Sequence, residues 1–254
     1  MIHSFLLIGQ SNAAGRGLLN EAPPLNNLDG RIKVQRNGRW QDMFRPLNPD
    51  RYFSGYCFAE SFAIKYAEAN PSVEVGIIPC ADGGTGLGQW QPGDLLFDNA
   101  VNCAKLAMRT SHLVGILWHQ GEGDCAPEAC ITYAERFGVM LNALREELNL
   151  PGIPVVLGGL GDFLGDFTTS VNISNNYKIV NEQLKKIAND YPNCEFVSAQ
   201  GLSGNTDNLH FSASSLEEFG RRYYDAFTKL DISETLNAQS VTDTDTFRTA
   251  LEKL

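Results

Sequence analysis

Phe5-Leu6-Leu7-Ile8-Gly9-Gln10-Ser11-Asn12 joins four apolar residues to a short polar turn. The apolar run predicts a buried strand, and the turn places Ser11 where a helix begins above the sheet. Backbone N–H groups are unpaired at a helix start and favour negative charge. They can receive the oxyanion that forms when a serine attacks an ester, so Ser11 is a candidate nucleophile. A Ser/Asn turn without chemistry explains the same residues.

Composition indicates one globular domain and narrows the classes of partner. The chain has 254 residues, of which 43% are hydrophobic, with 20 Lys and Arg against 30 Asp and Glu. A net charge of −10 with scattered basic residues argues against a nucleic-acid partner. We expect no membrane partner either, since no apolar run approaches the roughly 20 residues of a membrane-spanning helix. The sequence predicts a soluble protein, cytoplasmic as written, or secreted or periplasmic if a signal peptide was removed.

Six cysteines are dispersed among apolar neighbours, which is typical of small buried side chains. They stand at positions 57, 80, 103, 125, 130 and 194, without the spacing of a metal site. We therefore predict no metal and no other cofactor. The spacing of Cys125 and Cys130 permits a disulfide without requiring one.

Short apolar runs alternate with helical segments, which predicts an α/β fold with a mainly parallel sheet. Five strands are expected over 3–9, 73–79, 113–119, 154–160 and 195–199, with helices over 56–69, 98–109, 129–148, 175–191 and 214–229. Residues 18–54 read as a loop region with a small hairpin at Asn37-Gly38. Residues 1–230 form the predicted domain. A polar extension over 231–254, with a helical stretch at 248–253, is expected to pack on it.

In such folds ligands bind beyond the carboxyl ends of the strands, so the residues that follow each strand are candidates for the site. After the second strand comes Gly83-Gly84, where the backbone can approach a substrate closely, although a plain turn explains the pair as well. After the third come Gln120, an amide donor, and Glu122, an acceptor that can orient neighbouring side chains. Asp124 is interpreted as an acid that favours a helix start.

An Asp-x2-His pair follows the fifth strand. The spacing of Asp207 and His210 can place the carboxylate on one ring nitrogen, which leaves the other to take a serine proton. His119 is the rival base, because it also lies at a strand end. Together with Ser11, these strand-end residues make a complete set for acyl transfer.

Four blocks in this order resemble the SGNH hydrolases. They are Ile8-Gly9-Gln10-Ser11-Asn12-Ala13-Ala14-Gly15, Gly83-Gly84-Thr85, Trp118-His119-Gln120-Gly121-Glu122-Gly123-Asp124, and Asp207 to Phe211. Within that superfamily the chain resembles the carbohydrate acetylesterases of the sialate O-acetylesterase and acetylxylan esterase type, carbohydrate esterase family 6. The superfamily usually carries a Gly-x-Asn-Asp block where this chain has Gln120-Gly121-Glu122, and this departure points to that branch.

The resemblance implies a flavodoxin-like three-layer α/β/α sandwich over residues 3 to about 230. It implies Ser11 as nucleophile, His210 as base and Asp207 as the residue that orients it. The oxyanion donors would be the N–H groups of Ser11 and Gly84, with Gly83 close behind, plus Gln120. Supporting residues would be Gln10, Asn12, Gly83 and Glu122.

The expected reaction is hydrolysis of O-acetyl groups from carbohydrates through an acetyl-enzyme. The substrate would be an acetylated xylan-type polysaccharide or an O-acetylated sialic acid. Aromatic side chains able to stack on a sugar are Trp40, Tyr52, Phe53 and Trp90. Two alternatives remain open, a non-catalytic carbohydrate-binding protein on the same fold, and an esterase or thioesterase for longer acyl chains.

Overall fold

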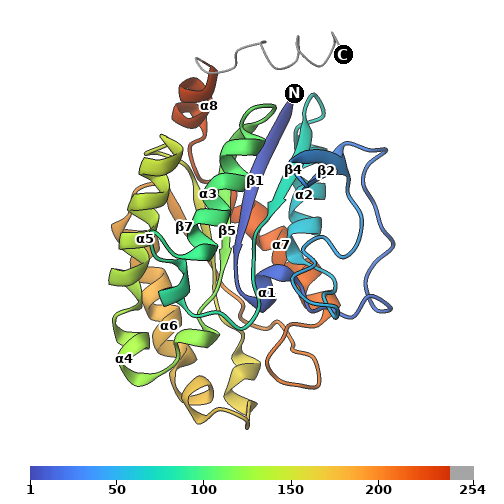
Figure 1. Cartoon of the computed structure of the whole chain (residues 1–254). Helices are drawn as coiled ribbons and strands as arrows, with labels where there is room; N and C mark the ends of the chain where they lie inside the picture. Colours follow the sequence, from blue (N-terminus) through green and yellow to red (C-terminus); the bar gives the residue numbers. More distant parts are fainter. Residues whose placement is uncertain (241–254) are drawn as a thin grey trace.

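The computed structural model describes residues 1–240, which fold around one central sheet (Figure 1). In this range the sheet has seven strands in the order β3-β2-β4-β1-β5-β6-β7, and all neighbours are parallel except β2 and β3. The strands are β1 (Ile2–Gly9), β2 (Ile32–Arg36), β3 (Arg39–Asp42), β4 (Glu74–Pro79), β5 (His112–His119), β6 (Val155–Gly158) and β7 (Cys194–Val197).

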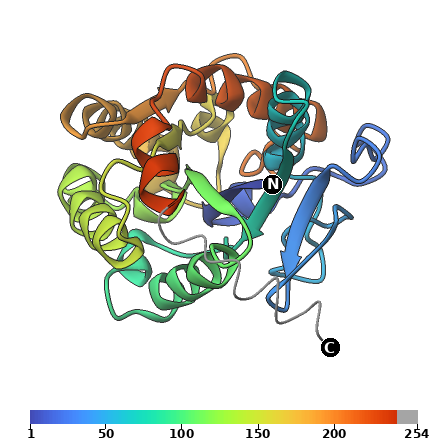
Figure 2. The ribbon, with the colours of Figure 1, turned by 90° about the horizontal axis from the view of Figure 1, so that it is seen from above.

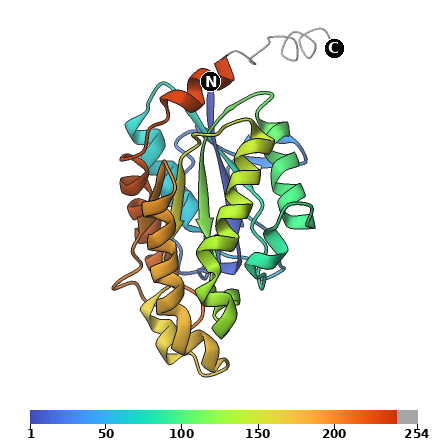
Figure 3. The same ribbon diagram turned by 90° about the vertical axis from the view of Figure 1, so that its left-hand side faces the viewer.

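Helices cover both faces of the sheet, so the predicted three-layer α/β/α architecture is confirmed (Figure 2). One face carries α3 (Leu95–Ala107), α5 (Tyr133–Leu148) and α6 (Val171–Asp190), which stand in front of the strands in Figure 3. The other face carries α2 (Phe58–Ala69) and α7 (Ala213–Phe227). A separate hydrophobic cluster lies on each face, which explains why β1, β5 and β6 are almost entirely buried.

Seven strands replace the five expected because the predicted hairpin joins the sheet. Asn37 and Gly38 have φ values of 51° and 73°, as a tight Asn-Gly hairpin turn requires. The hairpin is not confined to a surface loop, since Ile32 and Val34 are buried and pair in parallel with β4. Sequence reasoning missed this strand because only two of its five residues, Ile32 and Val34, are apolar.

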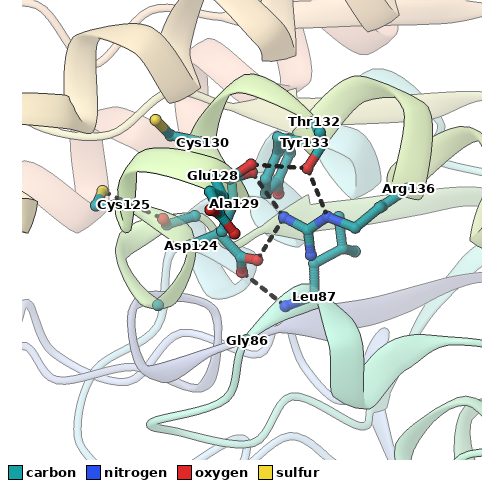
Figure 4. A network of polar contacts seen from close by, with 12 residues as sticks. Gly86, Leu87, Asp124, Cys125, Glu128, Ala129, Cys130, Thr132, Tyr133 and Arg136 are labelled. Atoms are coloured by element: carbon teal, nitrogen blue, oxygen red, sulfur yellow. Dashed lines mark hydrogen bonds and ion pairs between the residues drawn. The ribbon is translucent and has the colours of Figure 1, made fainter.

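The predicted helix over 129–148 is divided in two. It consists of α4 (Pro127–Ile131) and α5, which meet at Thr132. The Thr132 hydroxyl donates to the Glu128 carbonyl, and the Arg136 guanidinium donates to the Ala129 carbonyl (Figure 4). These side chains satisfy carbonyl groups that the interrupted helix leaves without N–H partners.

Beyond residue 230 the described chain forms α8 (Ser233–Ser240) at the end of the sheet opposite α1 (Ser11–Ala14) (Figure 1). Gln239 accepts from the Leu113 N–H at 2.8 Å and donates to the Leu113 carbonyl at 2.7 Å, which ties α8 to β5. The helical stretch predicted at 248–253 lies outside the described residues. Among residues 1–240, no helix is both long and apolar enough to cross a membrane.

Candidate active site

Ser11 stands at the carboxyl end of the central strand. It is the first residue of α1, directly after β1, at the lower edge of the sheet in Figure 1. Gly9 has a φ of 128°, and a Cβ on it would come within 2.1 Å of the His119 carbonyl oxygen. Only glycine fits this close approach of β1 and β5. After β1 the chain forms β2, β3 and β4 on one side of that strand and then crosses to β5 on the other side. Such a reversal of strand order is where ligands bind in α/β sheets, and a cleft lined by Ser11 lies there.

His210 lies between Ser11 and Asp207. Its Nε2 is 3.0 Å from the Ser11 Oγ, and its Nδ1 is 2.7 Å from the Asp207 Oδ2. The tautomer that satisfies both contacts donates from Nδ1 and accepts from the serine hydroxyl at Nε2. The structure therefore brings together the three residues that the sequence singled out, although Ser11 and His210 are 199 positions apart.

The Asp207 carboxylate also shapes the loop that carries His210. Its Oδ1 accepts from the N–H groups of Leu209 at 2.9 Å and His210 at 3.0 Å. Burial alone would raise the pKa of Asp207, but these N–H groups and the His210 ring together hold that pKa below its usual value. Asp207 is thus an anion that both orients the ring and fixes the backbone on which the ring stands.

Asn12 and Glu122 fix the same loop from the other side. Asn12 accepts from the Phe211 N–H at 3.1 Å and donates to the Leu209 carbonyl at 3.2 Å, so it holds the backbone on both sides of His210. The Asn12 amide also donates to Glu122 Oε1 at 2.5 Å. Burial would raise the pKa of Glu122, but interactions with His119 and Asn12 outweigh it and lower that pKa. Both residues had been expected to support the site.

The glycine pair approaches the serine as expected of a close-packed turn. A Cβ on Gly83 would lie 3.3 Å from the Ser11 Cβ, and the Gly83 N–H donates to Asp50 Oδ2 at 2.8 Å. Gly84 has a φ of 80° and lines the cleft. Within residues 1–240 the N–H groups of Ser11 and Gly84 have no protein acceptor, whereas that of Gly83 is engaged. Gly84 is therefore the better placed of the two to bind an oxyanion.

Gln120 differs from its expected place. It is fully buried, does not line the cleft, and its amide nitrogen lies within hydrogen-bond distance of Gln10 Oε1, the Thr85 carbonyl and Asp124 Oδ2. Both amide hydrogens are thus committed inside the protein, and we assign Gln120 to support rather than to the oxyanion. The Gln10 side chain is held at its oxygen, because Gln10 Oε1 accepts from Gln120 and from the Gly121 and Gly123 N–H groups. The Nε2 of Gln10 has no hydrogen bond to any described residue, and Gln10 lines the cleft.

Asp124 does more than favour a helix start. Its Oδ2 accepts from the Leu87 N–H at 2.6 Å and from Gln120, while its Oδ1 pairs with Arg136 at 2.8 Å (Figure 4). The carboxylate therefore ties α5 to the loop after β4, which carries the glycine pair.

Cys125 and Cys130 are free thiols, and Figure 4 shows their sulfur atoms well apart.

The cleft above Ser11 has a volume of about 400 Å³, within the roughly 300–1,000 Å³ of small-molecule sites. Two arginines line it, and each is paired with an aspartate. Arg16 makes a two-pronged ion pair with buried Asp50 at 2.7 and 3.0 Å, and Arg51 contacts Asp82 at 2.6 Å. Among the described residues, no group of three His, Cys, Asp or Glu side chains is arranged to hold a metal ion.

Comparison with known proteins identifies the family of this chain. Residues 1–229 match the family model described as "Carbohydrate esterase, sialic acid-specific acetylesterase". The chain belongs to this family.

Two proteins are similar to this esterase over most of its length. An Arabidopsis thaliana protein named as a probable carbohydrate esterase is 25% identical over 245 residues, which cover 85% of this chain and 86% of the plant protein. The crystal structure of that plant protein superposes with a TM-score of 0.78 over 89% of this chain and 98% of its own. The structure of NanS, 19% identical, has a TM-score of 0.68 over 90% of this chain and 97% of its own, which shows the shared fold.

Several site residues of this carbohydrate esterase escaped sequence reasoning. Arg16, Asp50 and Arg51 come from loops, and no spacing pattern links Arg16 to Asp50, 34 positions away. Phe53, expected as a sugar-stacking side chain, does line the cleft, and Tyr52 stands beside it. Trp90 does not: it is buried, and its indole N–H donates to Thr85. Trp40 packs away from the cleft, with its indole N–H on Thr110.

Proposed function

We propose that this carbohydrate esterase removes O-acetyl groups from sugars through an acetyl-enzyme on Ser11. The contacts from Ser11 Oγ to His210 Nε2 and from His210 Nδ1 to Asp207 Oδ2 are the observation that carries the proposal. His210 takes the serine proton as Oγ attacks the acetyl carbonyl, and then returns it to the departing sugar oxygen. In the second step, His210 takes a proton from water as the water oxygen attacks the acetyl carbon. His210 then gives that proton to the departing Ser11 Oγ, which releases acetate and restores free Ser11.

The developing oxyanion has donors that are already oriented. We assign the N–H groups of Ser11 and Gly84, and in place of Gln120 the Nε2 of Gln10, which is held at its oxygen by three N–H groups. Donors that are fixed before the reaction need no reorganisation when the charge appears. Loss of one such donor costs on the order of 3 kcal/mol of transition-state stabilisation. Gln10→Ala should therefore lower kcat by about 10²-fold, whereas Gln10→Glu adds charge and should be worse.

The ion pairs of the cleft favour a neutral sugar over sialic acid. A sialic acid carries a carboxylate, which would need a cation free to receive it. Arg16 and Arg51 are already paired with Asp50 and Asp82, and the nearby Glu122 and Asp207 are anions. A net charge of −10 adds further repulsion. We therefore propose an acetylated neutral glycan of the xylan type as the substrate.

Acetate release from acetylated xylan and from O-acetylated sialic acid tests this function, with Ser11→Ala as the matched control. We expect release by the native protein alone, faster from xylan, and a fall of at least about 10⁴-fold in Ser11→Ala. Release that survives in Ser11→Ala would disprove the mechanism, and faster release from sialic acid would disprove the substrate. A series of 4-nitrophenyl esters tests acyl length, and a maximum beyond about six carbons would contradict an acetylesterase.

A further inference from the structure

A second hollow adjoins the catalytic cleft. It has a volume of about 450 Å³, similar to the cleft itself, and each alone is large enough for a small-molecule site. Arg16, Phe53 and His210 line both, so the two hollows are halves of one depression that meet at the catalytic histidine. The second half is further lined by Leu18, Glu21, Gly204, Asn205, Thr206, Asp207 and Ser212.

The boundary between the two halves is an exposed aromatic ring held in place. Phe53 is 54% exposed, and the Arg16 guanidinium lies 5.1 Å from its ring centroid. Arg16 is itself fixed by Asp50, so its position is set from within the protein. Tyr52, 99% exposed, packs edge-to-face on Phe53 with ring centroids 4.9 Å apart. A pair of exposed rings beside a cleft offers flat apolar surface to a ligand.

Polar groups in the second half are free to receive hydroxyls. Within residues 1–240 the Glu21 carboxylate and the Thr206 hydroxyl make no hydrogen bond through their side chains, and both line the hollow. Asn205 uses its amide nitrogen on the Arg16 carbonyl, which leaves its side-chain oxygen as an acceptor. An apolar wall with a few polar groups suits a ligand with one apolar face and many hydroxyls, such as a pyranose. Acidic Glu21 disfavours a carboxylated one.

We propose that this second hollow binds the next sugar unit of the glycan whose acetyl group enters the cleft. The inference rests on the proposed function and extends it: the substrate is a chain of neutral sugars, not a free monosaccharide. An isolated sugar needs only the half beside Ser11. A chain fills both, with Phe53 between successive units, and binding energy from the second unit assists the reaction at the first.

The test compares substrates that differ only in length. We would measure kcat/KM for acetylated xylose, xylobiose and xylotetraose, with 4-nitrophenyl acetate as a readout of the triad. We expect a rise of about tenfold or more from xylose to xylobiose, and little further change at xylotetraose. Thr206→Trp fills the second hollow and should abolish the rise. If this variant does not fold, Phe53→Ala takes its place and should reduce the rise. Thr228→Trp, at the far end of α7, is the matched control and should keep it.

Binding without turnover gives an independent reading. In Ser11→Ala protein, calorimetry should show tighter binding of acetylated xylobiose than of acetylated xylose, and Thr206→Trp should remove the difference. Equal kcat/KM for all lengths in the native protein, or an undiminished rise in Thr206→Trp, overturns the second subsite while leaving the acetylesterase intact. Absence of acetate release from every sugar, with 4-nitrophenyl acetate still hydrolysed, overturns the proposed function and this inference with it.

Discussion

His210 and His119 each stand three residues from a carboxylate, yet their surroundings are opposite. His210 faces the cleft, with Asp207 on one ring nitrogen at 2.7 Å and Ser11 on the other at 3.0 Å. His119 is fully buried, with its Nε2 3.5 Å from Glu122 Oε1, which is too long for a strong hydrogen bond. It is surrounded by Phe58, Phe211 and Phe219, whose ring centroids lie 5.6 to 6.4 Å away.

A spacing of three residues permits a histidine and a carboxylate to pair. The position of the pair in the fold decides whether the histidine is buried or faces the cleft. His119 ends β5, a central strand, so its side chain enters the layer between the sheet and the helices α2 and α7. His210 belongs to a loop beyond the last strand, where solvent and substrate have access. The His119 ring is therefore enclosed in the core, whereas the His210 ring faces the cleft.

Substituting the two histidines one at a time should give the largest difference in kcat. His210→Ala removes the base, and we expect kcat to fall by roughly 10⁴-fold or more, close to the effect of losing the nucleophile. His119→Phe keeps an aromatic ring among phenylalanines, and kcat should change by less than about tenfold because His119 does not line the cleft. The measurement is kcat of each variant with 4-nitrophenyl acetate. Equal losses of kcat in the two variants would contradict the proposal that His210, and not His119, is the base.

Asp207→Asn should produce the next largest effect, a loss of about 10²-fold in kcat, because the amide favours the wrong tautomer of His210. We expect less than the loss known for a fully buried triad aspartate, since the Asp207 side chain is 46% exposed. Asparagine keeps the oxygen that accepts from Leu209 and His210 but loses the charge whose pKa the fold lowers, so we expect a small loss of thermal stability. A variant with native kcat would show that Asp207 serves the loop alone.

Glu122→Gln should leave more activity than Asp207→Asn and should change how stability depends on pH. The pKa of Glu122 is lower in the folded protein than its usual value. A lowered carboxyl pKa stabilises the fold at pH above the unfolded pKa, roughly 4.3, and this stabilisation is lost as pH falls through the folded pKa. Denaturant unfolding from pH 6 to 3 should therefore show a steeper acid loss in the native protein than in Glu122→Gln. Parallel curves would contradict the assigned direction.

Arg136→Lys should have the smallest effect, because Arg136 reaches the site only through Asp124. Lysine keeps the positive charge but loses the planar fork that serves Asp124, Ala129 and Thr132 together. We expect about 1 kcal/mol less unfolding free energy and a fall in kcat of less than about threefold. Arg136→Met, which also removes the charge, should cost more. A loss of kcat as large as in Asp207→Asn would place Asp124 among the residues that control the reaction directly.

Much of the fold, and the contacts among the residues proposed to react, could be predicted from local patterns. Apolar runs mark the buried strands because both faces of a parallel sheet are covered, and Asp207 and His210 contact each other within one turn of chain. Hydrogen bonds between segments distant in the sequence could not be predicted in this way. Gln120 has the right chemistry for an oxyanion donor, but three acceptors from separate segments hold its amide inside the protein.

The sequence by itself determined the alternation of strands and helices, the turn that presents Ser11, and the Asp207–His210 pair, since each depends on side chains a few residues apart. Only the tertiary structure decided that the 32–36 strand joins the sheet, that Gln10 rather than Gln120 faces the cleft, and that Arg16 and Asp50 hold Phe53 between two hollows. These depend on contacts between segments distant in the chain, where burial and competing hydrogen-bond partners choose among side chains of equal chemistry.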